Sequence, residues 1–352
     1  RIIVPGQSLQ LRGMMVWLPD RRGLLTHALN PTSGTYQIYF VSYADGALRP
    51  LTEDTDEYFG LWATADGRTI LTGRLDRLGS LQVAPLSDPR RARQLSPGLN
   101  FFNTLVWTPD GQLIYDQLAE NGRNLWRVSP SGGPPQQLTE ANGVNHHPCA
   151  SADGRYIVFA STQSGSEQVW RINADGGNPA QLTTAGGARP QCSPDGQWIV
   201  YESGHTPQQS LWKISIAGGA PMQLSQPGAA NPAISPDGAR IAYEYRDPAS
   251  NQWRLAVMPF AGGPPSKTFA VATGNGALRW ARDGRALLWA QGHSQGHANT
   301  LKLQPLDGGP PRTLLELASG SLYWFDLSPD GQQLAYISGN FALNLLLIRD
   351  LD

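Results

Sequence analysis

The sequence predicts an all-β protein, an eight-bladed β-propeller of four-stranded antiparallel blades. Three observations predict this fold: a recurring turn, a repeat of about 44 residues, and little helical patterning. The turn is an Asp-Gly pair, usually after proline, as in the stretch 233–243. Its eight aspartates are spaced 42 to 47 residues apart, at Asp20, Asp66, Asp110, Asp153, Asp195, Asp237, Asp283 and Asp330.

Each turn predicts two flanking strands, because proline presets φ and glycine takes the left-handed position that closes a hairpin. In the first unit we expect strands at 14–18, 24–28, 37–42 and 47–51. The whole chain, 1–352, is then one domain, with four strands in each unit. Its blades are expected near 13–51, 60–95, 104–138, 147–182, 189–224, 231–269, 277–314, and 322–352 plus 1–6.

The last blade includes residues 1–6 because the last unit ends with its third strand, near 345–348. Ile2, Ile3 and Val4 precede the first turn by the distance at which other units place a fourth strand. We therefore expect the N-terminal strand to close the ring and cover an edge that would invite aggregation.

Composition excludes some partners. The formal net charge is −1 and charged residues make up 16%, so there is no electrostatic footprint for nucleic acid. No apolar stretch is long enough for membrane insertion, and any targeting segment is expected to lie outside residues 1–352. The two cysteines, Cys149 and Cys192, fall on inner strands of adjacent units. We expect buried thiols there, with a disulfide as the alternative.

The repeats resemble a known family. Ser151-Ala152-Asp153-Gly154-Arg155, Cys192-Ser193-Pro194-Asp195-Gly196 and the turn Asp175-Gly176-Gly177 resemble the TolB-type, WD-like propeller repeats of bacteria. The stretches 257–263 and 347–350 look like the C-terminal propeller of bacterial Ser/Thr protein kinases and of winged-helix regulators. This resemblance implies a non-catalytic sensor or protein-interaction module of a larger signalling protein, with any kinase activity outside this chain. It favours an extracytoplasmic location, and a cytoplasmic one stays open.

Aligning the units on the turn aspartate locates candidate ligand-binding residues. The positions six and four residues before it vary from unit to unit, and repeat proteins vary where function resides. Because inner strands surround the channel, these positions are expected to form a polar mouth where the strands begin. The candidates are His147, Arg189, Asn231, Arg279, Trp324 and Asp326. Two arginines favour a small polar or anionic ligand, or a protein segment bearing carboxylate or phosphate. Alternatively, these side chains only pair with one another.

No catalytic residue, metal site or cofactor is predicted. The stretch 292–296 reads Gly-His-Ser-Gln-Gly, a nucleophile-elbow pattern, but both neighbours are strands, which favours a polar loop around Ser294. His146, His147 and Cys149 offer metal-ligand types without the spacing of a closed site. The alternative function is a propeller enzyme, a lyase or hydrolase acting at the channel mouth. The propeller of a peptidase without its hydrolase domain is a further alternative.

Overall fold

A computed structural model describes residues 11–30, 35–54, 56–95, 102–119, 122–140, 143–204, 208–247, 250–270, 277–292 and 298–349, and the structural statements below refer to these. Every helix or strand assigned in them is a β-strand. This part of the chain contains no helix that could cross a bilayer.

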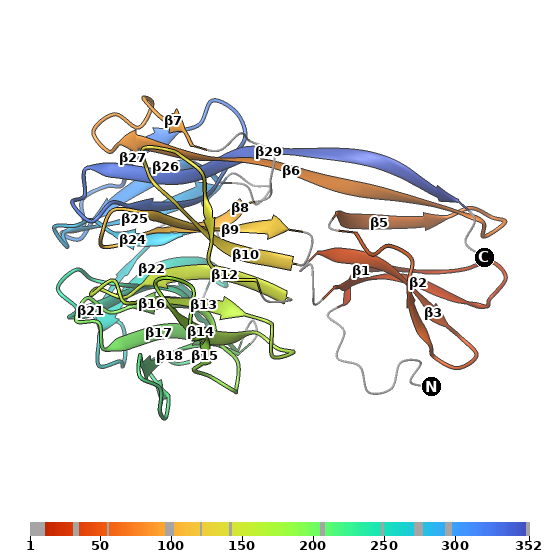
Figure 1. Cartoon of the computed structure of the whole chain (residues 1–352), viewed down its shortest axis with the longest axis horizontal. Helices are drawn as coiled ribbons and strands as arrows, with labels where there is room; N and C mark the ends of the chain where they lie inside the picture. The colour runs from red at the N-terminus through yellow and green to blue at the C-terminus, as the bar shows by residue number, and fades with distance from the viewer. Residues whose placement is uncertain are drawn as a thin grey trace.

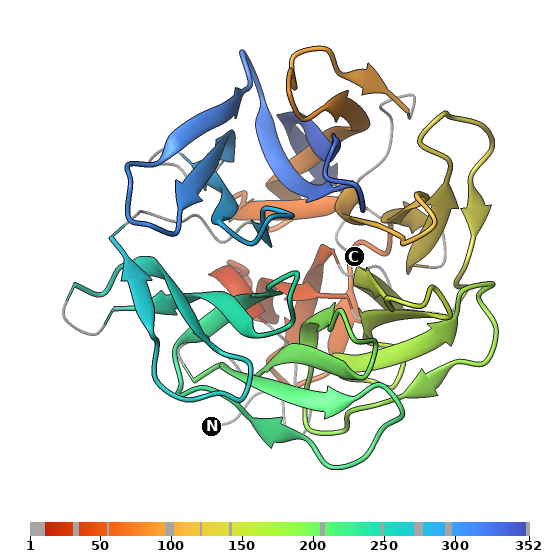
Figure 2. The same ribbon diagram turned by 90° about the vertical axis from the view of Figure 1, so that its left-hand side faces the viewer.

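Six blades of four strands each surround a central channel in the described part of the chain (Figure 2). The first two are β8 (Phe102–Trp107), β9 (Leu113–Ala119), β10 (Gly122–Val128), β11 (Gln136–Gln137), and β12 (Gly143–Ala150), β13 (Tyr156–Ser161), β14 (Gln168–Asn173), β15 (Ala180–Gln181). A short parallel pairing of β10 with β12 joins these two blades into one sheet. The next two are β16 (Ala188–Cys192), β17 (Trp198–Ser203), β18 (Ser210–Ser215), β19 (Met222–Gln223), and β20 (Ala229–Ile234), β21 (Arg240–Arg246), β22 (Trp253–Pro259), β23 (Lys267–Phe269). The fifth is β24 (Leu278–Trp280), β25 (Ala286–Gly292), β26 (Ala298–Pro305) and β27 (Arg312–Glu316).

The sixth blade joins the two ends of the chain. It contains β28 (Ser321–Leu327), the first half of β29 (Gln333–Arg349), the second half of β6 (Thr69–Pro85), and β7 (Arg93–Gln94). β29 and β6 pair antiparallel over their full length without a break in register. Two strands from each end of the chain therefore close the ring.

The other halves of β6 and β29 build a second, smaller body, which we call the sandwich. One sheet is β1 (Leu11–Trp17), β2 (Gly23–Leu29), β3 (Tyr36–Ser42) and β4 (Leu48–Pro50). The other combines β5 (Glu57–Ala63) with the first half of β6 and the second half of β29. Leu25, Ile38, Leu61 and Ile70, each fully buried, form its core between the two sheets. Figure 1 shows β6 and β29 running from the ring to the sandwich.

The ring differs from the prediction of eight blades closed by the N-terminus. Gly79 and Gly339, flanked by serine and asparagine, mimic turn signals but lie opposite each other inside the long β6–β29 pair. The second and last units therefore lack their predicted central hairpins and exchange halves instead. In the last blade, β6 occupies the third-strand place predicted for residues near 345–348, and β7 occupies the fourth-strand place predicted for residues 1–6, which lie outside the described residues.

The orientation of the ring follows from β29. This strand begins directly after the turn at Asp330 and runs towards the sandwich, so the Asp-Gly turns lie on the ring face away from the sandwich (Figure 1). Inner strands begin on the opposite face. The predicted open mouth is therefore turned towards the sandwich.

Candidate functional site

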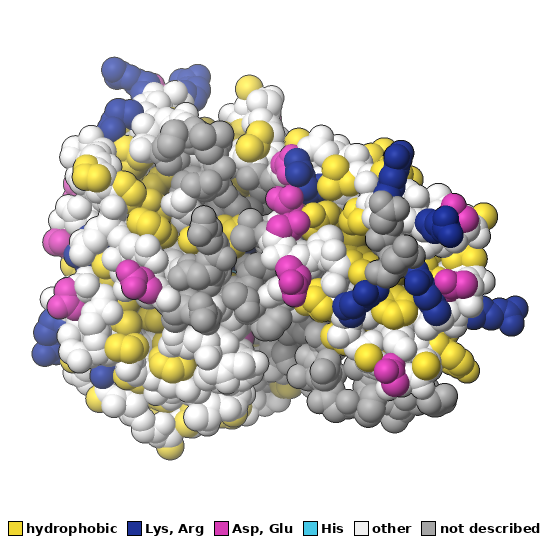
Figure 3. Space-filling view, turned by 45° about the vertical axis from the view of Figure 1, so that its right-hand side comes forward, with side chains coloured by type: hydrophobic (Ala, Val, Ile, Leu, Met, Phe, Trp, Pro, Cys, Tyr) yellow, Lys and Arg dark blue, Asp and Glu magenta, His cyan; other side chains and the backbone are white. Residues whose placement is uncertain are grey.

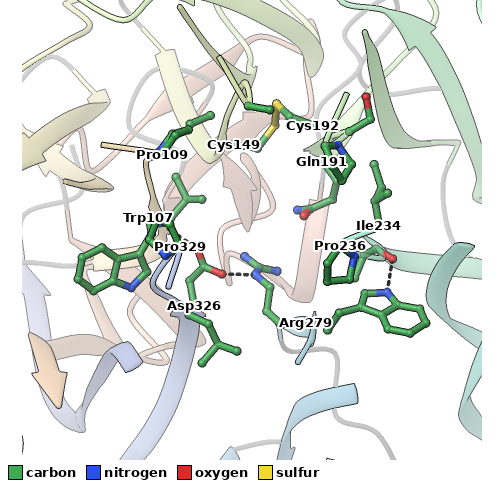
Figure 4. A pocket seen from close by; sticks show the side chains of 18 of the residues that line it. Trp107, Pro109, Cys149, Gln191, Cys192, Ile234, Pro236, Arg279, Asp326 and Pro329 are labelled. Atoms are coloured by element: carbon green, nitrogen blue, oxygen red, sulfur yellow. Dashed lines mark hydrogen bonds and ion pairs between the residues drawn. A yellow bond between two sulfur atoms is a disulfide. The ribbon is translucent and has the colours of Figure 1, made fainter. Parts of the chain in front are cut away.

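A cavity of about 340 Å³ opens into the channel at the end that carries the turns. All six inner strands line it, from β8, β12, β16, β20, β24 and β28. The position four residues before the turn aspartate contributes from every blade, with Val106, Cys149, Gln191, Ala233, Arg279 and Asp326. Figure 4 shows Gln191 and Arg279 pointing into the cavity, with Asp326 beside Arg279. The six-fold backbone thus carries an asymmetric set of side chains.

Arg279 and Asp326 form a buried ion pair across two blades. Arg279 Nε donates to Asp326 Oδ1 at 2.8 Å, and the side chains are only 12% and 10% exposed. The second oxygen, Oδ2, accepts the backbone N–H of Trp107 at 2.8 Å. Since each group has a partner, the charges compensate each other, and the pair links three blades around the axis.

The other four candidates lie further along the inner strands, towards the sandwich. His147, Arg189 and Asn231 have φ of 51°, 48° and 52°, and each coincides with a shift in the register of its strand. Such bulges redirect a side chain and free a backbone N–H from the ladder. Polar side chains accept these N–H groups, Thr104 Oγ1 from His147 at 3.0 Å and Glu202 Oε1 from Asn231 at 2.5 Å.

Ring contacts connect this layer to the ion pair. The His147 and Trp324 rings are 5.2 Å apart between centroids, and Arg279 Cζ lies 5.5 Å from the Trp324 ring centroid. Arg189 Nε lies 4.0 Å from Glu202 Oε1, at the outer limit of an ion pair. The structure therefore brings all six predicted residues into one cluster that spans five inner strands.

Three polar atoms of the cluster are buried without a hydrogen-bond partner among the described residues. They are His147 Nδ1, Arg189 Nη1 and Trp324 Nε1. Buried polar atoms are normally paired, so each unpaired one requires an explanation such as a bound molecule. Two of the three are N–H donors, which suits a ligand rich in acceptors.

Three acidic members of the cluster, Asp116, Glu202 and Glu244, are additional to the six predicted residues. Asp116 accepts the backbone N–H of Thr104 at 2.6 Å and lies 3.5 Å from Arg123. Glu244 accepts from the Asn231 side chain at 2.5 Å. A repeated signal marks these acids, because a tyrosine precedes Asp116, Glu202 and Glu244 within an apolar second strand. Aligning second strands would have identified them.

Burial controls the protonation of this site. It lowers the pKa of His147 well below the ordinary value of 6.5, and the charges of His146, Arg189, Arg123 and Arg279 lower it further. Burial also raises the pKa of Asp116 and of Glu202, against the opposing effect of neighbouring arginines. At neutral pH the site therefore combines a neutral imidazole with guanidinium donors, a combination that suits an anionic ligand.

Cys149 and Cys192 form a disulfide, with Cα atoms 5.9 Å apart, so the expectation of two thiols is wrong. The bond joins the inner strands of adjacent blades and lies in the cavity wall (Figure 4). Alternation along the strands turns the two side chains towards each other, the geometry that a disulfide requires.

The remaining motifs contribute no chemistry that the structure describes. A disulfide-bonded Cys149 offers no thiolate to a metal, and within the described ranges no group of three or more His, Cys, Asp or Glu could hold one. His146 instead lies 2.7 Å from Glu167. The strands β25 and β26 flank the Gly-His-Ser-Gln-Gly pattern as expected, but Ser294 itself lies outside the described residues.

Comparison with solved structures shows the same fold. A TolB described as putative, from Agrobacterium tumefaciens, matches with a TM-score of 0.65 at 21% identity, over 75% of this chain and 99% of its own. TolB from Acinetobacter baumannii matches with a TM-score of 0.57 at 13% identity, over 95% of this chain and 80% of its own. A gluconolactonase from Xanthomonas campestris matches with a TM-score of 0.53 at 13% identity, over 76% and 91%.

At these identities the structural matches show the fold alone, and no curated protein matches the sequence. A family model does match. The model of the TolB β-propeller domain, PD40, covers residues 87–277, more than half of the chain. Four complete blades lie within or reach into that range. The chain therefore belongs to the TolB β-propeller domain family.

Proposed function

We propose that this chain is a non-catalytic binding propeller that recognises an anionic small molecule or a carboxylate-bearing protein segment in its channel. One observation carries the proposal: His147, Arg189 and Trp324 converge with three buried polar atoms unpaired among the described residues. A carboxylate would accept hydrogen bonds from the Arg189 guanidinium and the Trp324 indole, whose N–H donors lack partners among the described residues.

We also propose that the propeller is the sensor module of a larger bacterial signalling protein, outside the cytoplasm. The resemblance to kinase-linked propellers supports the first part. The Cys149–Cys192 disulfide supports the second, because such bonds persist in oxidising compartments and are rare in the cytosol.

The ligand proposal is tested with citrate and inorganic phosphate as anionic probes, and glucose as a neutral one, by isothermal titration calorimetry. We expect Arg189→Gln to weaken binding of an anionic probe about tenfold or more, the effect of losing a charged hydrogen bond of about 1.5–3 kcal/mol. Its melting temperature should stay close to that of the parent, because the Glu202 contact is long. Arg285→Gln, which changes an exposed arginine of the same ring, is the control.

Arg279 is a poor choice for this test. Its removal would leave Asp326 buried with only the Trp107 N–H as partner, so stability would fall together with binding. If Arg189→Gln binds the anions as tightly as the parent and Arg285→Gln, the proposal is wrong.

One observation favours an enzyme as second candidate: the neutral His147 imidazole lies beside guanidinium groups that would hold a carboxylate-bearing substrate against it. The same calorimetric titrations with an oligouronate distinguish the two functions. Chemical turnover, seen as continuous heat and product by mass spectrometry, would contradict a purely binding role.

A further inference from the structure

The sandwich ends in a strand edge that no other strand of the described residues covers. β28 pairs with β29 only as far as Gly339, and from Asn340 to Arg349 the strand pairs with β6 alone among the described strands. Figure 1 shows this half of β29 along the outer margin of the molecule. The register with β6 runs unbroken, so no bulge interrupts the edge.

Natural proteins protect such edges with lysine, proline, bulges or a covering element. The stretch 340–349 contains no lysine and no proline, and its one charge is Arg349 at the end. We call this stretch the free edge. Its backbone is an accessible template for another strand.

The free edge is also apolar on its outer side. Leu343, Leu345 and Leu347 are 53%, 68% and 58% exposed. The register places Phe59 and Trp62 of β5 on the same face, 42% and 49% exposed. These five account for half of the ten large exposed hydrophobic residues described in the chain. Figure 3 shows hydrophobic side chains exposed between charges of both signs over the sandwich.

The inner side of the free edge is incomplete as well. Leu346 and Ile348 point towards the sandwich core but are only partly buried, in contrast to Leu61 and Ile70 on the neighbouring strands. One more strand beside β29 would cover the flank of this core and extend the apolar face. We therefore expect the binding partner of the free edge to be a β-strand.

We propose that the occupant is the free edge of a second copy. Two β29 strands pair antiparallel about a two-fold axis at Leu345, which forms one continuous sheet from two sandwiches. Leu345 then lies opposite Leu345 of the other copy, and Leu343 lies opposite Leu347. Because side chains alternate along a strand, this register keeps all six leucines on one face as cross-strand pairs.

Charge favours this arrangement over the other occupants. Antiparallel pairing places the two Arg349 side chains at opposite ends, about 26 Å apart, whereas parallel pairing would set them side by side. An anionic membrane surface gains no net attraction from the sandwich, because its arginines are matched by acidic residues, and Arg74 is paired with Asp56 and Asp76. Pairing covers a strip about 30 Å long, below the roughly 1,200 Å² of a standard interface, so we expect micromolar association.

Sedimentation velocity of the whole chain from roughly 1 to 200 µM tests the proposal. The parent should shift from monomer to dimer in this range. Leu345→Lys should weaken dimerisation at least tenfold, because it sets two like charges opposite each other at the axis. Met222→Lys is the control, since Met222 is 43% exposed on β19 of the ring, and it should dimerise like the parent.

Cysteine crosslinking tests the register independently of stability. Oxidised Leu345→Cys should form a covalent dimer, because opposite residues of an antiparallel pair have Cα atoms about 4.5–5.5 Å apart, within disulfide range. Leu343→Cys alone should not, whereas its mixture with Leu347→Cys should. A chain that stays monomeric throughout, a dimer that survives Leu345→Lys, or equal crosslinking of all three single variants would overturn the proposal.

Discussion

Three residues of the channel cluster adopt a backbone conformation that normally favours glycine. His147, Arg189 and Asn231 have positive φ, at an expected cost of about 1–2 kcal/mol for each residue that is not glycine or asparagine. The bulges position the three side chains in the cluster, and two of them present a backbone N–H to a polar side chain, His147 to Thr104 and Asn231 to Glu202. Strain at these positions is thus compensated by hydrogen bonds that the regular ladder could not make.

The buried imidazole makes stability depend on pH. The folded protein holds His147 neutral, while the unfolded chain protonates this residue near pH 6.5, so the unfolded state binds more protons below that pH. Stability from this group is present above pH 6.5 and is lost as the pH falls. At one pH unit below 6.5 we expect a loss of about 1.4 kcal/mol.

Urea unfolding of the parent and of His147→Asn between pH 7.5 and 5.5 isolates this effect; asparagine tolerates positive φ. The variant should lose less stability on acidification than the parent. Asp116 and Glu202, with raised pKa, act in the opposite direction, but they are common to both proteins and cancel in the comparison. Parallel curves for the two proteins would show that His147 binds a proton as readily in the folded protein as in the unfolded chain, and would contradict the lowered pKa.

Sequence reasoning identified the channel candidates because they occupy variable columns of a clear repeat. It missed Asp116, Glu202 and Glu244, which lie on second strands and act through the bulge residues of first strands. The residues at the bulges, among them Thr104, His147 and Arg189, have different side chains, so no common sequence pattern marks a bulge. The hydrogen-bond partners of the bulge residues therefore depend on the strand register in the folded structure.

At the scale of elements, the β6–β29 pair determines the architecture. Gly79 and Gly339 face each other where this pair leaves the ring, and a Cβ on Gly339 would lie 1.9 Å from the Leu78 carbonyl oxygen. Glycine is needed at this point because two backbones approach closely. The same residues, flanked by Ser80 and Asn340, resemble hairpin turns in sequence. Local sequence cannot distinguish a turn from a close strand crossing.

Substitution at this crossing should be costly. We expect Gly339→Ala to lower the free energy of unfolding by about 2–4 kcal/mol, because the backbone must move to admit the methyl group. Gly309→Ala is the matched control, where the new methyl group lies 3.2 Å from the end of the flexible Asp307 side chain and in ordinary van der Waals contact with Pro305. Chemical denaturation measures both. Equal stability of the two variants would mean that the crossing adapts at little cost.

At the scale of the molecule, a closed ring and a sandwich share two strands. The sequence correctly indicated an all-β propeller of four-stranded blades, since the turn repeat and its length are properties of every unit. The number of blades depended on how two units exchange halves across the chain. This pairing joins strands that are far apart in the sequence, and the number of repeats gives no information about it.

The disulfide should stabilise the ring as a whole. It closes a loop with a sequence separation of 43 residues, for which loop entropy predicts about 4 kcal/mol of stabilisation. The double variant Cys149→Ala, Cys192→Ala should therefore melt at a lower temperature than the oxidised parent. Under reducing conditions the parent should approach the variant, and its mass should rise by two hydrogens. An oxidised parent that is no more stable than the variant would contradict this estimate.

The shared strands also set the order of events during synthesis. Partners in the β6–β29 pair, such as Ser80 and Ser338, are 258 residues apart along the chain. Five blades can form on local contacts as they leave the ribosome, whereas β6 must wait for β29 before either the sixth blade or the sandwich is complete. A nascent chain that has not yet reached β29 therefore exposes to chaperones the long edge of the 17-residue strand β6 that β29 later covers, whereas β5 and β7 can already pair along its other edge. One late pairing step then completes both bodies.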